Sequence, residues 1–159
     1  MRNTPDITRT VSRHTLAYML FSISEMCRHY SDFDPLDLLI VHAILNANVV
    51  SVMNDQSLDE RFSAIDAVEP DAIKQGVSRA ALSRFLSLPL ETVRRRVTRL
   101  KRLEILTEGK SGLIVTELNA FRFGNNHALQ KTNMLLVTKL LRDLRRAGIN
   151  GPDDLSIGR

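Results

Sequence analysis

Apolar residues recur with helical spacing in three long segments, 11–30, 34–53 and 127–147. In segment 11–30 they follow alternating steps of four and three residues up to Tyr30, which is the spacing of a helix-packing seam. Segment 34–53 is apolar almost all the way round, which predicts a central helix covered on several sides. We expect the two outer helices to form a homodimer through these residues: Leu16, Leu20, Ile23, Cys27, Val137, Leu140, Leu141 and Leu144.

The stretch 76–117 has a different pattern, with two short helices followed by a hairpin. Ser78 is a suitable N-cap for a helix over residues 79–86. Residues 87–89 break that helix, and the proline at the end of the break fits the start of a second helix over 90–103. The remaining part predicts two short strands joined by a Gly-containing turn, with Lys110 at its tip.

The second short helix has two unlike faces. At about 100° per residue, Val93, Val97 and Leu100 fall on one arc, which predicts a buried stripe. Glu104 falls on the same arc, and guanidinium groups cover most of the remaining circumference. Residues 74–110 hold ten basic and three acidic side chains, so this block carries all of the positive net charge of the chain. Such a concentration of cations is the electrostatic footprint of a polyanion, usually nucleic acid.

The run SRAALSRFLSLPLETVRRRVTRLKRLEILTE resembles the winged helix-turn-helix DNA-binding domains of bacterial transcriptional regulators, in particular the MarR-like and GntR-like groups. The similarity lies in a small helix, a Pro-Xaa-Xaa-Thr-Val turn into an arginine-rich helix, and a Leu-rich exit into a two-stranded wing. Glu104 stands where many such domains have Gly. The resemblance implies a mostly helical fold with a winged helix-turn-helix between long N- and C-terminal helices.

These observations predict a sequence-specific protein that binds double-stranded DNA and regulates transcription as a homodimer. We expect Arg95 and Arg99 to read bases, because a guanidinium bonds guanine bidentately. Thr92 should lie near a phosphate, and Lys110 should reach the minor groove or the backbone. The other expected DNA-binding residues are Ser78, Arg94, Arg96 and Arg102, which would hold phosphates, and Arg79.

Two other functions share these features. A winged helix can also be an interaction module, in which case the basic face would bind an acidic protein. A replication or partition protein of a mobile element would share both the fold and the DNA affinity. The sequence does not separate these functions from that of a transcriptional regulator.

The whole chain divides into six predicted regions, which include a central helix and an acidic connector. The central helix has Asp34 as its expected N-cap and Asp37 at the position of a capping-box acid. The connector is acidic and holds one expected short helix over residues 58–68. The regions are a flexible arm (1–10), N-terminal helices for the core and the dimer (11–56), the acidic connector (57–75), the winged helix-turn-helix (76–117), a C-terminal dimerisation helix (118–148) and a flexible tail (149–159).

The composition narrows the function classes further. The sequence shows no phosphate-binding loop, no nucleophile elbow and no paired metal-ligand spacing, so we expect no enzyme activity, no metal and no cofactor. The single Cys27 excludes an internal disulfide, and the first residues lack the apolar core of a signal peptide, so we expect a cytoplasmic protein without a membrane partner. A small-molecule effector fits this class of protein, but His42, Asn46 and Asn48 are too few polar groups in the central helix to identify one.

Overall fold

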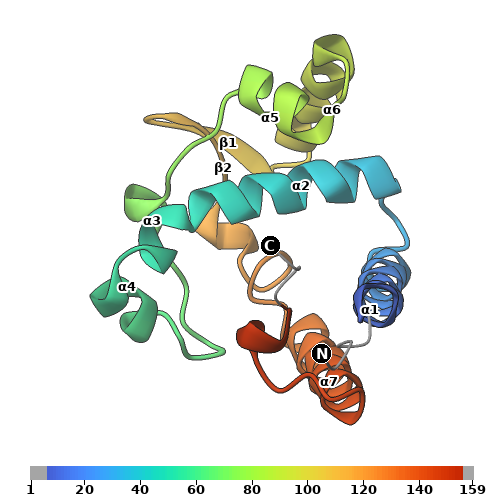
Figure 1. Ribbon diagram of the computed structural model, residues 1–159. Helices are drawn as coiled ribbons and strands as arrows, with labels where there is room; N and C mark the ends of the chain where they lie inside the picture. The colour runs from blue at the N-terminus through green and yellow to red at the C-terminus, as the bar shows by residue number, and fades with distance from the viewer. Residues whose placement is uncertain (1–6, 156–159) are drawn as a thin grey trace. The chain divides into compact units, whose positions relative to one another are not determined.

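The computed structural model describes residues 7–155 of the 159-residue chain (Figure 1). It divides into two compact units, one formed by residues 30–127 and the other by the segments 1–29 and 128–159. The described part is mostly helical with a small antiparallel sheet, as the sequence predicted. Most of the predicted arm and the end of the predicted tail lie outside the described residues.

Helix α2 (Pro35–Asn48) runs through the centre of the unit 30–127 (Figure 1). Asp34 caps its N-terminus, because its carboxylate accepts a hydrogen bond from the Leu36 N–H at 2.8 Å, as the sequence predicted. The helix is buried on most sides, which explains why its sequence is apolar nearly all the way round. Its fully buried apolar residues are Leu38, Ile40, Val41 and Ile44.

Asn48 ends α2 and joins it to a distant segment. Its backbone carbonyl accepts a hydrogen bond from the Gln75 N–H at 3.2 Å, and its side-chain amide donates to the Gln75 carbonyl at 2.8 Å. The chain then turns at Val49 and continues as the short helix α3 (Val50–Met53). The single helix predicted over residues 34–53 is therefore two helices, because Asn48 directs its polar groups to residue 75.

The acidic connector contains helix α4 (Gln56–Arg61) and the 3-10 helix η1 (Asp71–Ile73). The predicted helix over 58–68 therefore had the wrong bounds. Asp55 starts α4 earlier, because its carboxylate accepts two hydrogen bonds from N–H groups of the first turn, at 3.0 and 3.1 Å.

Helices α5 (Arg79–Leu86) and α6 (Leu90–Arg102) follow as a pair joined by a short turn. The Ser78 hydroxyl oxygen accepts a hydrogen bond from the Ala81 N–H at 3.1 Å and caps α5, as predicted. The turn is tight because Ser87 adopts a left-handed backbone with φ 53°. The buried face of α6 consists of the three predicted residues, Val93, Val97 and Leu100.

The exit from α6 is sharp although no glycine occupies it. The helix ends at Arg102, and Glu104 adopts the left-handed backbone with φ 58° that glycine adopts at least cost. The Asn119 side-chain amide donates to the Glu104 carbonyl at 2.7 Å and stabilises this turn. Glu104 is exposed, so its predicted place on the buried arc is wrong, because the helix ends before that position.

Strands β1 (Leu106–Gly109) and β2 (Gly112–Val115) form an antiparallel hairpin with a two-residue turn. Val77 adds a third extended segment, because it exchanges two backbone hydrogen bonds with Leu113, at 2.9 and 3.1 Å. The backbones approach closely at Gly112, whose φ is 135°. The predicted hairpin is present, and its sheet contains one more segment than the sequence indicated.

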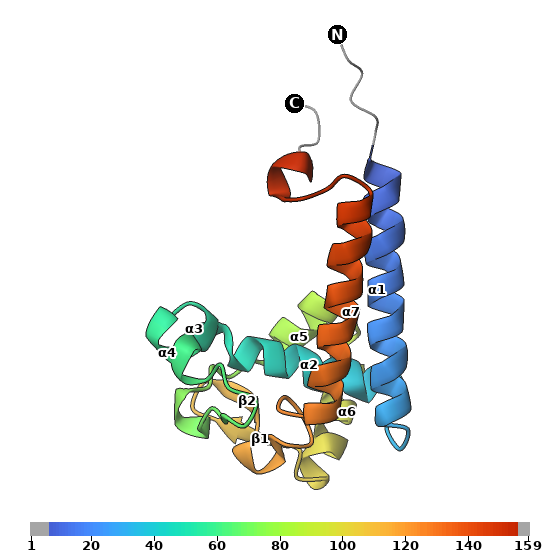
Figure 2. The same cartoon turned by 90° about the horizontal axis from the view of Figure 1, so that it is seen from below.

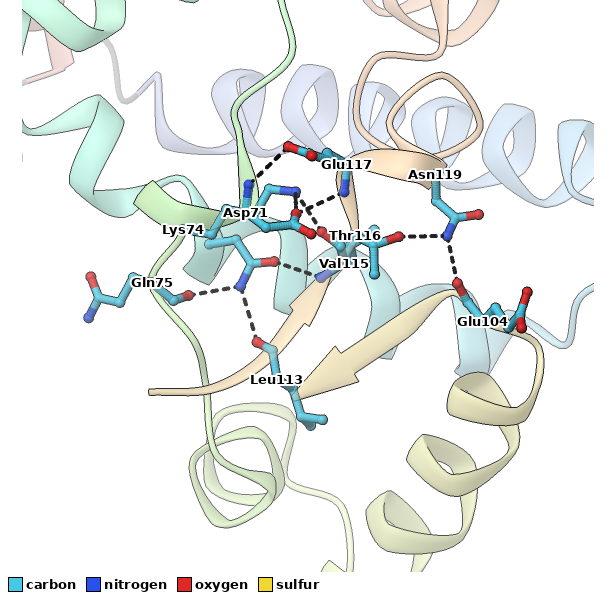
Figure 3. A network of polar contacts seen from close by, with 10 residues as sticks. Asp71, Lys74, Gln75, Glu104, Leu113, Val115, Thr116, Glu117 and Asn119 are labelled. Atoms are coloured by element: carbon cyan, nitrogen blue, oxygen red, sulfur yellow. Dashed lines mark hydrogen bonds and ion pairs between the residues drawn. The ribbon is translucent and has the colours of Figure 1, made fainter. Parts of the chain in front are cut away.

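Polar groups bind the hairpin to α2 and η1 (Figure 3). The Asn48 side-chain amide donates to the Leu113 carbonyl at 3.2 Å, and its side-chain oxygen accepts from the Val115 N–H at 3.0 Å. The Lys74 ammonium group donates to the Val115 carbonyl and to the Asp71 carboxylate, both at 2.7 Å. Lys74 therefore satisfies interior groups and does not add to the basic surface.

An aromatic cluster completes the core of this unit. Tyr30 is buried, and its ring stacks on Phe123 with the ring centroids 4.8 Å apart. Burial raises the pKa of the Tyr30 hydroxyl to about 12. Tyr30 is thus a core residue of unit 30–127 and does not continue the predicted seam.

The neighbouring His42 bonds the Leu38 carbonyl at 2.7 Å, and burial lowers the pKa of its imidazole.

Helices α1 (Thr8–His29) and α7 (His127–Arg146) lie side by side along their lengths (Figure 2). The Tyr18 hydroxyl donates to the side-chain oxygen of Asn133 at 2.9 Å across this pair. The long helices predicted at both ends of the chain are present, and the first begins three residues earlier than expected. Among the described residues, no helix combines the length and the apolar composition needed to cross a membrane.

The segment after α7 is partly structured. Gly148 has a φ of 85°, as expected for a residue that follows the C-terminus of a helix. Ile149 is buried, and residues Pro152–Leu155 form the 3-10 helix η3. The predicted flexible tail (149–159) is therefore wrong for its first residues, because Ile149 is packed in the interior.

The close approach of the Gly112 and Val77 backbones can be tested by substitution. A Cβ atom on Gly112 would lie 2.7 Å from the backbone of Val77. Gly112→Ala should therefore force the two backbones apart and lower the free energy of unfolding by about 1–3 kcal/mol. Urea denaturation measures this loss. Gly151→Ala is the matched control, because a Cβ there meets no atom within 4 Å. Equal stability of the two variants would contradict the described approach.

Candidate nucleic-acid interface

Helix α6 presents a strip of exposed side chains on the side opposite its buried face. At about 100° per residue, this strip covers nearly a third of the helix circumference. It is polar along its whole length, and three of its five members are arginines. We call it the exposed strip, and it consists of Glu91, Arg94, Arg95, Thr98 and Arg102; Arg99, which is also exposed, borders it.

One flank of α6 is bonded to the start of α2 through four charged residues, which we call the Asp37 cluster. The Asp37 side chain is fully buried. One of its oxygens accepts a hydrogen bond from Arg96 at 3.1 Å, and the other accepts one from Arg99 at 2.7 Å. Arg96 also pairs with Asp34 at 2.9 Å. A buried carboxylate bonded to two guanidinium groups holds one helix on the other, because separating them would leave a charge unpaired in the interior.

The Asp37 cluster bears on the roles predicted for three residues. Asp37 was predicted only as a capping-box acid in the first turn of α2, and the structure shows that it also bonds two arginines of α6. Arg96 is half-buried and pairs with both Asp34 and Asp37, so its geometry does not favour the predicted phosphate contact. Arg99 bonds Asp37 through one nitrogen, but its side chain is 52% exposed, so its role as a base reader stays a prediction. The hydrogen bond from the Leu36 N–H, with a contribution from Arg96, lowers the pKa of the Asp34 carboxyl.

The opposite flank of α6 is bonded to the hairpin through Glu108. This carboxylate pairs with Arg79 at 2.6 Å and with Lys101 at 3.2 Å. The hydrogen bond from Arg79 is the largest cause that lowers the pKa of Glu108. Arg79 therefore links α5 to β1 and shares one carboxylate with Lys101, and its predicted role in DNA binding stays a prediction.

The remaining cations of the block 74–110 face outward. Within residues 7–155, the structure records no ion pair for Arg84, Arg95, Arg102 or Lys110, and all four are exposed. Arg94 is also exposed, and its guanidinium lies 3.6 Å from the Glu91 carboxylate. Lys110 occupies the tip of the hairpin, as the sequence predicted. The cations available to a partner are thus fewer than the sequence count indicated.

Two predicted phosphate contacts lie at helix N-termini. Ser78 is exposed, but its hydroxyl oxygen already accepts the capping hydrogen bond of α5. Thr92 is half-buried in the first turn of α6, where the backbone N–H groups of the helix have no partner within the helix. Both positions remain compatible with a phosphate, because the free N–H groups and the helix dipole favour an anion there.

The predicted dimerisation residues lie on α1 and α7 and are incompletely covered in the single chain. Leu20 of α1 is 58% exposed, and Leu141 of α7 is 62% exposed. Neither helix contains a buried residue. The other predicted members are exposed in the case of Leu16 and Ile23 and half-buried in the case of Cys27, Val137, Leu140 and Leu144.

The structure also shows where the possible metal ligands of residues 7–155 and the polar residues of α2 lie. No group of three His, Cys, Asp or Glu side chains in this range is placed to hold a metal ion. Of the three polar groups that the sequence left for an effector, His42 and Asn48 bond internal carbonyl groups, and Asn46 is exposed. His42 and Asn48 therefore contribute to the packing of this unit.

The sequence analysis missed the Asp37 cluster and the role of Glu108. Charge alone shows ten cations in one block, but it does not show which of them meet a carboxylate from elsewhere in the chain. One signal was present, because Asp37 is a charged residue within an otherwise apolar helix and such a charge needs a partner when it is buried.

Comparison with protein-family models, curated proteins and solved structures found no significant match to this chain.

The Asp37 cluster generates a test of its structural role. Asp37→Ala should lower the free energy of unfolding by about 3 kcal/mol, because it leaves Arg96 and Arg99 without their buried partner. Urea denaturation at neutral pH measures the change. The matched control is Asp32→Ala, which removes an exposed ion pair with Arg122 at 3.2 Å and should cost less than about 1 kcal/mol. A loss for Asp37→Ala no greater than that of the control would contradict the role.

Proposed function

We propose that this chain is a winged helix-turn-helix protein that binds double-stranded DNA and regulates transcription as a homodimer. The observation that carries the proposal is the exposed strip of α6. Its arginines are exposed and make no ion pair with another element within residues 7–155, whereas the cations on the two flanks are ion-paired with Asp34, Asp37 and Glu108. A helix held on both flanks with a cationic outer strip suits insertion into the major groove.

The order of elements supports this proposal. The pair α5 and α6 has the short turn of a helix-turn-helix, and the β1–β2 hairpin follows at once, in the place of a wing. Val77 supplies a short extended segment before α5 that pairs with β2. Lys110 at the hairpin tip would then contact a phosphate or the adjacent minor groove.

The contacts divide the arginines of α6 into two groups. Arg95 is the base reader that we retain, because it is exposed near the N-terminal half of the helix, where recognition helices contact base edges. Arg94 and Arg102 would hold phosphates, and the exposed Arg84 of α5 joins them as a further candidate. Arg96 and Arg99 would fix the angle at which α6 meets the duplex, through Asp37, and the exposed Arg99 stays a predicted base reader.

The apolar side chains of α1 and α7 support a homodimer. Several of them are about half-exposed or more, and monomeric proteins rarely leave a large apolar patch uncovered. A second copy of the chain would cover them, and two copies would present their recognition helices to two half-sites about one helical turn apart. The residues concerned are Leu16, Met19, Leu20, Phe21, Ile23, Met134, Leu135 and Leu141.

DNA binding is tested with a labelled random-sequence duplex by fluorescence anisotropy across a salt series. The parent protein should bind at low salt and lose affinity steeply as salt rises, because binding releases counterions. Arg102→Ala should make the slope of log K against log salt shallower by about 1. Arg145→Ala, which removes an exposed arginine of α7, should leave the slope unchanged. Absence of parent binding even at low salt would refute the proposal and favour an acidic protein partner.

The dimer is tested by sedimentation equilibrium. The parent should have twice the 18.0 kDa mass of the chain. Leu20→Asp should give the monomer mass, because it places a charge in the apolar contact. Leu118→Asp is the control, since Leu118 is 91% exposed in the other unit and should not affect the mass. Circular dichroism shows whether each variant keeps its helices. A folded Leu20→Asp variant with the parent mass would place the dimer contact elsewhere.

A further inference from the structure

Glu91 is the one acidic residue of the exposed strip. It is the second residue of α6, and its side chain is 83% exposed. Its nearest charged group is the Arg94 guanidinium, 3.6 Å away, which is an ion pair but longer than a hydrogen bond. The carboxylate therefore keeps its acceptor positions open to a partner.

The carboxylates that bond the two flanks of α6 have structural roles. Asp34 and Asp37 bond its arginines on one flank, and Glu108 bonds Arg79 and Lys101 on the other. Glu91 pairs with Arg94 of its own helix at 3.6 Å, and within residues 7–155 the structure records no ion pair from it to another element. On a surface that meets phosphates, an exposed carboxylate lowers affinity for every DNA sequence, because like charges repel. Glu91 therefore does not lie on this strip in order to strengthen DNA binding in general.

Two properties of the position indicate a more specific role. The N-terminal residues of a recognition helix are those that contact base edges in the major groove. A carboxylate there accepts a hydrogen bond from the exocyclic N4 amino group of cytosine, which is the only base edge that presents a donor without a neighbouring acceptor of its own. Arg95 lies four residues further on the same strip, where its guanidinium can donate to a guanine close by.

We propose that Glu91 is a specificity-determining residue that accepts a hydrogen bond from the N4 amino group of a cytosine in the major groove. The inference rests on the proposed DNA binding through α6. Repulsion of phosphates by Glu91 weakens binding to all sequences, and the cytosine contact offsets this loss at the preferred site only. Glu91 thus increases the ratio of specific to non-specific affinity.

The experiment is a selection from a library of random-sequence duplexes, followed by affinity measurements on the selected site and its single-base variants. The parent should select a site with one fixed C·G pair that it prefers by at least about fivefold over the other pairs. Glu91→Ala should reduce this preference to near one and should bind random duplex more tightly than the parent. Glu91→Gln should shift the preference towards adenine, because a glutamine side chain bonds adenine bidentately.

Glu104→Gln is the matched control, since Glu104 is exposed but lies beyond the end of α6 and outside the exposed strip. It should select the parent site with the parent preference. Thermal melting of each variant separates base reading from helix stabilisation, because a carboxylate in the first turn also interacts favourably with the helix dipole.

Two outcomes would overturn the inference in different ways. If Glu91→Ala and Glu91→Gln select the parent site with unchanged preference and differ only in melting temperature, Glu91 is a helix-stabilising residue and the proposed DNA binding stands. If the parent itself binds no duplex at low salt, the proposed function fails and the inference fails with it. The parent measurement therefore distinguishes the two failures.

Discussion

The position of α6 depends on one buried carboxylate. Asp37 lies in the first turn of α2, fully shielded from solvent, and each of its oxygens bonds a different arginine of α6. A charge without solvent or partners in the interior is costly, so α6 is held at the angle and the rotation at which Arg96 and Arg99 reach Asp37. That rotation determines which residues of α6 point outward. The exposed strip is therefore a consequence of the Asp37 cluster as well as of the apolar stripe Val93, Val97 and Leu100.

The hairpin is held by a second set of buried polar contacts. The side chain of Asn48 satisfies backbone groups of residues 75, 113 and 115, so the end of α2 supplies hydrogen bonds that the small sheet lacks (Figure 3). Lys74 does the same for the carbonyl of Val115. Because buried backbone groups need partners, these contacts join α2, η1 and the hairpin into one unit. The hairpin tip with Lys110 projects from a base that is bonded on several sides.

Many of the cations in the block 74–110 are ion-paired with carboxylates of the chain, and Arg99 among them is still 52% exposed. Five of the ten basic residues in the block 74–110 bond Asp71, Asp34, Asp37 or Glu108 within the described part of the chain, namely Lys74, Arg79, Arg96, Arg99 and Lys101. The exposed remainder lies on the outer side of α6, on α5 and at the hairpin tip. This division supports the proposal of a nucleic-acid surface with few, well-placed cations, on which a single carboxylate such as Glu91 has a measurable effect.

The sequence by itself determined the local elements. Periodic apolar residues, the caps Asp34 and Ser78, the proline before α6 and the Gly-containing turn predicted the helices and the hairpin, because these signals depend only on neighbours along the chain. The tertiary structure alone decided which arginines are bonded to α2, where α2 ends, and how Val77 joins the sheet. Each of these depends on a partner tens of residues away, such as Asp37 for Arg99 or Gln75 for Asn48, and spacing along the chain carries no information about such pairs. The sequence thus located the basic surface, and only the packing of α2 on α6 determined which side chains that surface presents.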